Sequence, residues 1–304
     1  MKKNILTRRQ FLKESTTAAL VGTLYLNVPK KLKAENNKKT RVVLIRNRDV
    51  MKWTKDGKVQ LNRPRQEVVK EMLDEAVKVL LNEKDAASAW KKLIHPDDIV
   101  GIKTNVWRQL PTTREVEIAI KQGVLTAGVP ENNISIGDRG ILYDPIFQKA
   151  TALINARPMR THHWAGVGSL LKNYIMFIEN PSSYHPDTCA DLAKIWKLPL
   201  VKGKTRLNIL VMFTPLFHGI GPHHFNPKYV WPYCGLLVGT DPVAVDATGL
   251  RILLARRREF FKENRPINPP PKHIILADTR YGLGTADPDN IELVKLGWQE
   301  GALI

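Results

Sequence analysis

The hydrophobic positions along the chain form short apolar runs that alternate with helical patterns. Apolar, β-branched runs predict strands at residues 41–46, 99–103, 134–137, 152–155, 207–213, 235–239 and 273–277. Apolar residues at helical spacing, together with capping signals, predict helices at residues 65–84, 112–128, 187–197, 241–263 and 288–295. Residues 47–64 are polar and rich in turn formers, which predicts a long loop. Strands that alternate with helices indicate an α/β fold, with a mostly parallel sheet flanked by helices on both faces.

Three of these helices carry explicit start signals. Thr112 and Glu115 have the spacing of a capping box, and Asp187 is the expected cap of its helix. Asp241 followed by Pro242 is the strongest signal, because Asp is favoured at the N-cap and Pro at the first helical position.

Residues 1–34 have the pattern of a twin-arginine signal peptide. Residues 7–13 (TRRQFLK) match that motif at every position, and a mildly apolar run follows at residues 18–28. This run is shorter than the roughly 20 residues that a membrane-spanning helix needs. A basic, cytosolic N-terminus is the alternative. We expect a periplasmic protein that is exported folded and touches the membrane only transiently, with residues 35–304 as a single α/β domain.

The charge balance favours anionic ligands. The net charge is +18, and residues up to Lys39 include ten Lys or Arg and two Glu, so eight of these charges lie there and ten in the remainder. A basic surface could bind nucleic acid, but an exported protein argues against that partner. The two cysteines, Cys189 and Cys234, are too few for an iron–sulfur cluster, so none is expected from this chain alone. They form either one disulfide or two separately buried thiols.

Polar side chains follow several predicted strands, where open α/β sheets bind ligands. We expect this group to bind substrate: Lys103, Asn105, Asp138, Arg157, Asn173 and Asp241. Individually these residues are also ordinary turn formers, solvated lysines or, for Asp241, a helix cap.

The stretch from residue 153 to residue 177 concentrates titratable groups between two apolar segments. We expect catalytic groups here and in two later segments, namely His162, His163, Lys172, His218 and Asp246. Lys172 stands among apolar residues, so we expect it to be buried with Asp138 or Asp246 as its carboxylate partner.

Five of the eight histidines lie in two predicted loops, so a metal ion is a candidate cofactor. Its ligands would be His162, His218 and His223. The spacing matches no zinc motif, and local hydrogen bonding or proton transfer is the alternative role for these imidazoles.

Several segments together resemble a bacterial family, domain-of-unknown-function family 362. Residues 99–105 (IVGIKTN) resemble its Lys-x-Asn strand end, and residues 239–249 (GTDPVAVDATG) its Asp-Pro-x-x-x-Asp helix start. Residues 154–173, 219–222 and 281–293 also fit, although Arg160 stands where the family pattern has a lysine. No ferredoxin-like cysteine cluster is attached, although some relatives carry one. The resemblance implies a fold and a site location, but no established activity.

Three classes of function remain open, of which the third is attachment to an acidic membrane or envelope polymer through the ten excess positive charges of residues 40–304. The first is an exported enzyme of unknown activity, dependent on a metal or another cofactor, that acts on a small anionic substrate. The second is a non-catalytic periplasmic binding protein, or an assembly or accessory protein for a redox system, whose partner would be a redox protein.

Overall fold

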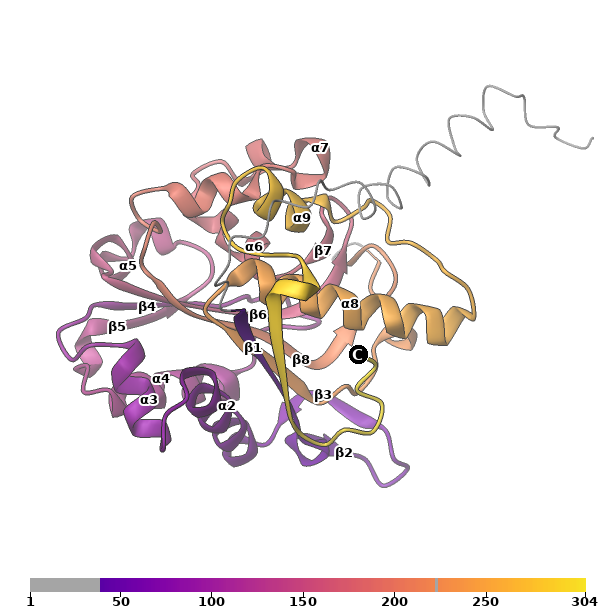
Figure 1. Ribbon diagram of the computed structural model, residues 1–304, viewed down its shortest axis with the longest axis horizontal. Coiled ribbons are helices and arrows are strands. Elements are labelled where there is room, and N and C mark those ends of the chain that lie inside the picture. Colours follow the sequence, from indigo (N-terminus) through magenta and orange to yellow (C-terminus); the bar gives the residue numbers. More distant parts are fainter. Residues whose placement is uncertain (1–38, 222–223) are drawn as a thin grey trace, which may run out of the picture. The chain divides into compact units, whose positions relative to one another are not determined.

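A central sheet organises the chain, as seen in the computed structural model, which describes residues 39–221 and 224–304 (Figure 1). The strands of its main path are, in spatial order, β10 (Ile291–Gly297), β1 (Thr40–Arg46), β9 (Gly235–Gly239), β8 (Thr205–Leu216), β6 (Ala152–His162), β4 (Val100–Lys103) and β5 (Ile134–Gly137). A short strand, β7 (Gly166–Gly168), pairs with the end of β6. The signal-peptide prediction for residues 1–34 lies outside the described residues.

The strands run mostly in one direction. β9 is antiparallel to both of its neighbours and β7 is antiparallel to β6, whereas the other neighbouring strands pair in parallel. The predicted α/β class, with a mostly parallel sheet, is therefore confirmed.

Helices cover both faces of the sheet (Figure 1). One face packs on α2 (Gln66–Leu81), α3 (Ala86–Leu93) and α4 (Arg114–Thr126). The other packs mainly on α5 (Pro145–Lys149), α6 (Leu170–Asn173), α7 (Pro186–Cys189), α8 (Pro242–Phe261) and α9 (Lys272–Thr279). In β1, Val42 and Leu44 enter one core while Val43 and Ile45 enter the other. Burial on both faces explains why the strand reads as a continuous apolar run.

The N-terminal third differs from its prediction in two places. Residues 47–64 form a hairpin of β2 (Met51–Trp53) and β3 (Val59–Pro64), not a loop. The capping box at Thr112 does not form, because the Thr112 hydroxyl donates to the Ala156 carbonyl and accepts from the Asn105 amide. By contrast, Asp241 caps α8 as predicted, accepting hydrogen bonds from the Val243 and Ala244 amides.

The last two elements exchange their predicted types. Residues 273–277 belong to helix α9, not to a strand, and residues 288–295 lead into strand β10, not a helix. Short apolar runs do not distinguish helix from strand by periodicity alone. For residues 288–295, tertiary pairing determines the strand, because β10 pairs in parallel with β1 along its whole length.

The predicted helix at residues 187–197 is not one continuous α-helix. Asp187, Thr188 and Cys189 have φ angles of 50°, 56° and 61°, in the left-handed region, so Asp187 is not a helix cap. A 3₁₀ helix follows at Leu192–Lys197. Three consecutive left-handed residues without glycine are unfavourable, at roughly 1–2 kcal/mol each, so surrounding contacts hold this turn in place.

Strand β6 is much longer than the predicted residues 152–155. It continues to His162, with a register shift between Pro158 and Arg160, and all eleven of its residues are buried. The central polar stretch therefore begins as a strand in the middle of the sheet.

Among the described residues, no helix is long and apolar enough to cross a membrane.

We predict that Gly123→Ala destabilises the protein despite the better helix propensity of alanine. Gly123 lies in α4, and a methyl group there would overlap the indole of the fully buried Trp90. Propensity favours alanine by about 1 kcal/mol, whereas overpacking costs about 1–3 kcal/mol. Chemical denaturation should show a lower free energy of unfolding. The exposed neighbour provides a control, since Gln122→Ala should change stability little; an unchanged Gly123→Ala variant would contradict the packing of α4 on α3.

Candidate functional site

A buried ion pair joins the ends of two neighbouring parallel strands. Lys103 ends β4 and is fully buried, and its ammonium donates to Asp138 Oδ1 at 2.5 Å and to the Thr104 carbonyl at 2.7 Å. Asp138 directly follows β5, and the register that pairs Lys103 with Gly137 brings the two side chains together. Burial lowers the pKa of Lys103 to about 8, although Asp138 opposes this shift. Burial also acts to raise the pKa of Asp138, but the cation of Lys103 holds it below its usual value.

Three asparagines extend this network across the sheet. Asn173 of α6 accepts from Lys103 and donates to Asn155 Oδ1 at 2.8 Å and to the Lys103 carbonyl at 3.2 Å. Asn155 in β6 donates to the Leu170 carbonyl at 3.1 Å and to Asn208 Oδ1 in β8 at 3.2 Å. These bonds fix α6 on the sheet, so Asn173 acts here as a structural residue.

Asp246 holds the start of α6 from the opposite side. It is fully buried in α8, and it accepts from the Ser169 hydroxyl at 2.6 Å and from the Leu170 and Leu171 amides at 2.9 Å each. Burial raises the pKa of Asp246 to about 6, which these hydrogen bonds and Arg157 oppose. Its carboxylate is therefore mostly ionised at neutral pH and is used by the backbone of α6.

Arg157 and Arg160 of β6 are buried with little compensation. Their exposed fractions are 4% and 2%. Arg157 Nε has no hydrogen-bond partner in the described part of the chain, and the same holds for Arg160 Nε and Nη1. Arg160 Nη2 donates to Asn105 Oδ1 at 3.0 Å, and its guanidinium lies 4.4 Å from the ring centre of Trp107. Burial lowers the pKa of Arg157 to about 10, and burial with the charge of Arg157 lowers that of Arg160 well below its usual value.

Lys172 is the third uncompensated cation. It lies in α6 with an exposed fraction of 3%, and its ammonium donates to the Cys189 thiol at 3.5 Å. The expected carboxylate partner is wrong, because Asp138 pairs with Lys103 and Asp246 binds the backbone of α6. Burial lowers the pKa of Lys172 to about 8; Arg157 and Arg160 act in the same direction and Cys189 opposes it. We call Arg157, Arg160 and Lys172 the cationic cluster.

Imidazoles surround the cationic cluster without adding charge. His162 ends β6, and its Nδ1 accepts the Trp164 amide at 3.2 Å, so a neutral ring carries its proton on Nε2. His162 stacks on His163 at 4.6 Å, and Trp164 stacks on His185 at 3.7 Å. Burial, followed by the charge of Lys172, keeps the pKa of His162 far below its ordinary value and lowers that of His185 to about 4.

His273 of α9 is fully buried, and neither of its ring nitrogens has a partner among the described residues. Burial lowers its pKa to about 3, with Lys172 and Arg157 contributing, so the ring is neutral and lies near both cations.

The remaining predicted residues lie apart from the cationic cluster. His218 Nδ1 lies 3.1 Å from Arg257 Nη1, and the ring packs against Tyr229 and Phe261. Asp241 uses Oδ1 to cap α8 and Oδ2 to accept the Thr285 amide. In the described part of the chain, no group of three His, Cys, Asp or Glu is placed to hold a metal ion. His223 lies outside that part, so the metal site at His162, His218 and His223 stays a prediction.

The two cysteines lie in different cores. Cys189 packs on the α8 face of the sheet and Cys234 on the α2 face, and both are free thiols. Of the two sequence alternatives, the structure has separately buried thiols.

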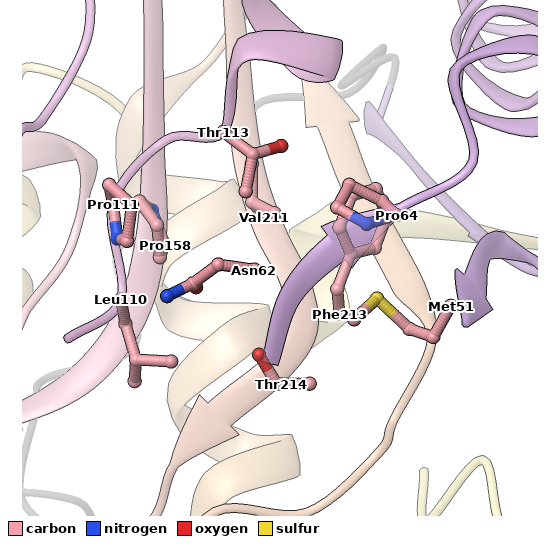
Figure 2. Close-up of a pocket in the computed structure, with 10 residues that line it drawn as sticks. All are labelled: Met51, Asn62, Pro64, Leu110, Pro111, Thr113, Pro158, Val211, Phe213 and Thr214. Carbon is pink, nitrogen blue, oxygen red and sulfur yellow. The ribbon is translucent and has the colours of Figure 1, made fainter. Parts of the chain in front are cut away.

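A small pocket lies near the carboxyl end of the sheet, but it lacks charged groups (Figure 2). Its volume of about 20 Å³ is enough for roughly one water molecule. The lining residues are Met51, Asn62, Pro64, Leu110, Pro111, Thr113, Pro158, Val211, Phe213 and Thr214. None belongs to the cationic cluster, so we place the candidate site at the cluster and not in this pocket.

The fold and the site together define an α/β protein with a mostly parallel sheet and a buried cationic cluster beside it. A family model described as "Domain of unknown function (DUF362)" matches residues 130–251. The matched part runs from β5 into α8 and includes Asp138, Asp246 and all three cations of the cluster. This match supports the resemblance over that part of the chain. No curated protein and no solved structure matches significantly.

The sequence prediction found some members of this site and missed others. It included Lys103, Asp138, Arg157 and Lys172, because they follow strands or interrupt apolar runs. It did not include His185 or His273 as site residues, and it noted Arg160 only as a departure from the family pattern. The sequence could have indicated Arg160 as a site residue. Asn155, Arg157 and Arg160 are polar or basic positions in one stretch between two apolar runs, which indicates a polar face. For His273, nothing in the local pattern indicates proximity to Lys172.

Removing Lys103 and removing Lys172 should have opposite effects on stability. Lys103→Met leaves Asp138 buried without its cation, which should cost roughly 3–5 kcal/mol. Lys172→Met removes a buried charge that has no carboxylate partner in the described part of the chain, so the free energy of unfolding should rise by about 1–3 kcal/mol at neutral pH. Chemical denaturation of both variants measures the difference.

The effect of Lys172 should also depend on pH. Its pKa is about 8 in the folded protein against an ordinary value of 10.5, so the unfolded state binds the extra proton between these values and wild-type stability rises with pH there. The advantage of Lys172→Met should therefore shrink as pH increases from 8 toward 10.5. A destabilised Lys172→Met variant at neutral pH would show that Lys172 is structurally compensated.

Proposed function

We propose that the protein is an exported enzyme that binds a small anionic substrate at the cationic cluster. The observation that carries this proposal is the burial of Arg157, Arg160 and Lys172: within residues 39–221 and 224–304, no carboxylate is in ion-pair contact with them, and three guanidinium nitrogens lack hydrogen-bond partners. Burying a charge is strongly unfavourable unless it is paired. A bound anion would supply the missing negative charge and accept hydrogen bonds from these nitrogens.

Lys172 is the best candidate for proton transfer in such an enzyme. A pKa of about 8 lets it hold and release a proton near neutral pH, whereas an exposed lysine stays charged. His162 is a poorer choice, because its ring stays neutral and can only donate a hydrogen bond from Nε2. In this mechanism Arg157 and Arg160 hold the substrate anion, His162 orients it, and Lys172 moves a proton to or from it.

A non-catalytic binding protein would use the same two arginines. The cluster's low exposure favours this second candidate, since a nearly closed site retains its ligand. The two differ at Lys172: a binding protein with Lys172→Met keeps most of its function, whereas the proposed enzyme loses turnover while it still binds substrate.

The affinity for an anion should fall above pH 8. We expect binding of sulfate, whose charge is constant in this range, to be level below about pH 8 and then to weaken by up to about tenfold per pH unit as Lys172 loses its proton. The neighbouring imidazoles are already neutral, and burial raises the pKa of the Cys189 thiol, so these groups do not produce the change. Lys103 has a pKa of about 8 as well, so a Lys172 variant is needed to assign the change to Lys172. Calorimetric titration across this pH range measures it.

The Lys172→Met variant separates this effect from general loss of positive charge. Its sulfate affinity should be weaker at neutral pH, and it should lose the part of the decline above pH 8 that comes from Lys172, leaving only the contribution of Lys103. If the variant kept the wild-type pH profile, Lys172 would not be part of the anion site.

The export part of the proposal depends on Arg8 and Arg9. Replacing both by lysine should retain the precursor in the cytoplasm, because the twin-arginine pathway requires this pair. Cell fractionation measures the distribution. Replacing Lys38 and Lys39 by glutamine removes the same kind of residue outside the motif and should leave export intact. Export of the Arg8→Lys, Arg9→Lys double variant at wild-type level would exclude this route.

A further inference from the structure

The buried charges around the cationic cluster do not balance. Lys103, Arg157, Arg160 and Lys172 are buried cations, and the carboxylates whose charges act on them are those of Asp138 and Asp246. Among the residues that the structure describes, four cations against two carboxylates leave two positive charges without a counterpart. Lys103 already has Asp138, so the excess belongs to the cationic cluster.

From this imbalance we infer that the ligand is a dianion, with two negative charges on oxygen atoms, as in a phosphate monoester or a dicarboxylate. The inference rests on the proposed anion site and specifies its substrate class. A monoanion would leave one buried cation uncompensated, whereas a dianion neutralises the excess.

The hydrogen-bond donors that we assign to the ligand come from two different elements, β6 and α9. In β6, Arg157 offers Nε and Arg160 offers Nε and Nη1, which have no partner among the described residues, and His273 offers a neutral N–H from α9. The imidazole of His273 adds a donor without adding charge, so it increases the number of oxygen contacts and leaves the charge balance unchanged. This combination suits a group with several oxygens and two charges.

Gly168 allows the guanidinium of Arg157 to occupy its place. A Cβ atom at this position would lie 2.8 Å from Arg157 Nη2 and 3.4 Å from Arg157 Cζ. Gly168 does not have a positive φ, so alanine is compatible with the backbone and acts only by displacing Arg157. Gly168→Ala therefore moves one of the two arginines without removing its charge.

Calorimetric titration of the dialysed mature protein at about pH 7 tests the inference. The probes are sulfate and succinate as dianions, inorganic phosphate as a mixture of its monoanion and dianion at this pH, and acetate and nitrate as monoanions, all at equal ionic strength. We expect the dianions to bind at least about tenfold more tightly than the monoanions. Sulfate or phosphate exceeding succinate identifies a phosphoryl-type ligand, and the reverse order identifies a dicarboxylate.

Charge matching makes a second, sharper prediction. Arg157→Gln removes one of the two excess charges, so the preference for sulfate over acetate should fall to near unity. Gly168→Ala should weaken sulfate binding while the total charge stays the same, which also covers the case in which Arg157→Gln does not fold. Arg258→Gln removes an exposed cation of α8 and should retain the wild-type preference.

The outcomes separate this inference from the proposed function. Equal affinities for acetate and sulfate in the wild type would overturn the dianion and leave an anion site. No binding of any probe to the folded protein would overturn both. An unchanged sulfate preference in folded Arg157→Gln would also overturn the inference, because the excess charge would then not determine the ligand.

Discussion

The ion pair between Lys103 and Asp138 is the interaction on which the site depends. It lies at the point where β4 and β5 end in register, and Asn173 connects it to α6, the helix that carries Lys172. The pair has a second consequence for charge. Because Asp138 forms its ion pair with Lys103, it forms none with Arg157 or Lys172. Its negative charge still acts to raise the pKa of Arg157. A structural ion pair thus leaves the neighbouring cations uncompensated.

Asp246 shows the same division of roles. A fully buried carboxylate close to Arg157 could have formed a second ion pair, yet its oxygens accept from Ser169 and from two amides at the start of α6. Both buried carboxylates therefore position backbone and side chains, while the cations keep donors free. An apolar replacement of such a cluster would usually be at least as stable. Folding therefore does not account for this cluster, and its burial is consistent with the anion site proposed above.

The sequence predicted the fold class and the ends of the short strands well, because strands buried on both faces form continuous apolar runs and Asp241-Pro242 marks a helix start. It assigned Lys103 and Asp138 to one group of strand-end residues, but it offered Asp138 as a partner for Lys172 and not for Lys103. It failed where tertiary pairing overrides local pattern. Strand β6 extends through Asn155, Arg157 and Arg160, which look like loop residues because their burial depends on α6, on β8 and on each other. The strand β10 forms because β1 offers it an edge, and His273 reaches the site only because α9 packs beside α8.

The left-handed turn at residues 187–189 completes the surroundings of Lys172. Its backbone conformation is unfavourable, so the contacts that hold it must compensate, and among these is the Cys189 thiol 3.5 Å from the Lys172 ammonium. A thiol is a weak acceptor compared with a carboxylate, and it gives the ammonium a partner without neutralising it. His185, four residues earlier, stacks on Trp164 and is itself neutral. The described groups around Lys172 therefore bury it without supplying a carboxylate, and this burial lowers the pKa of Lys172.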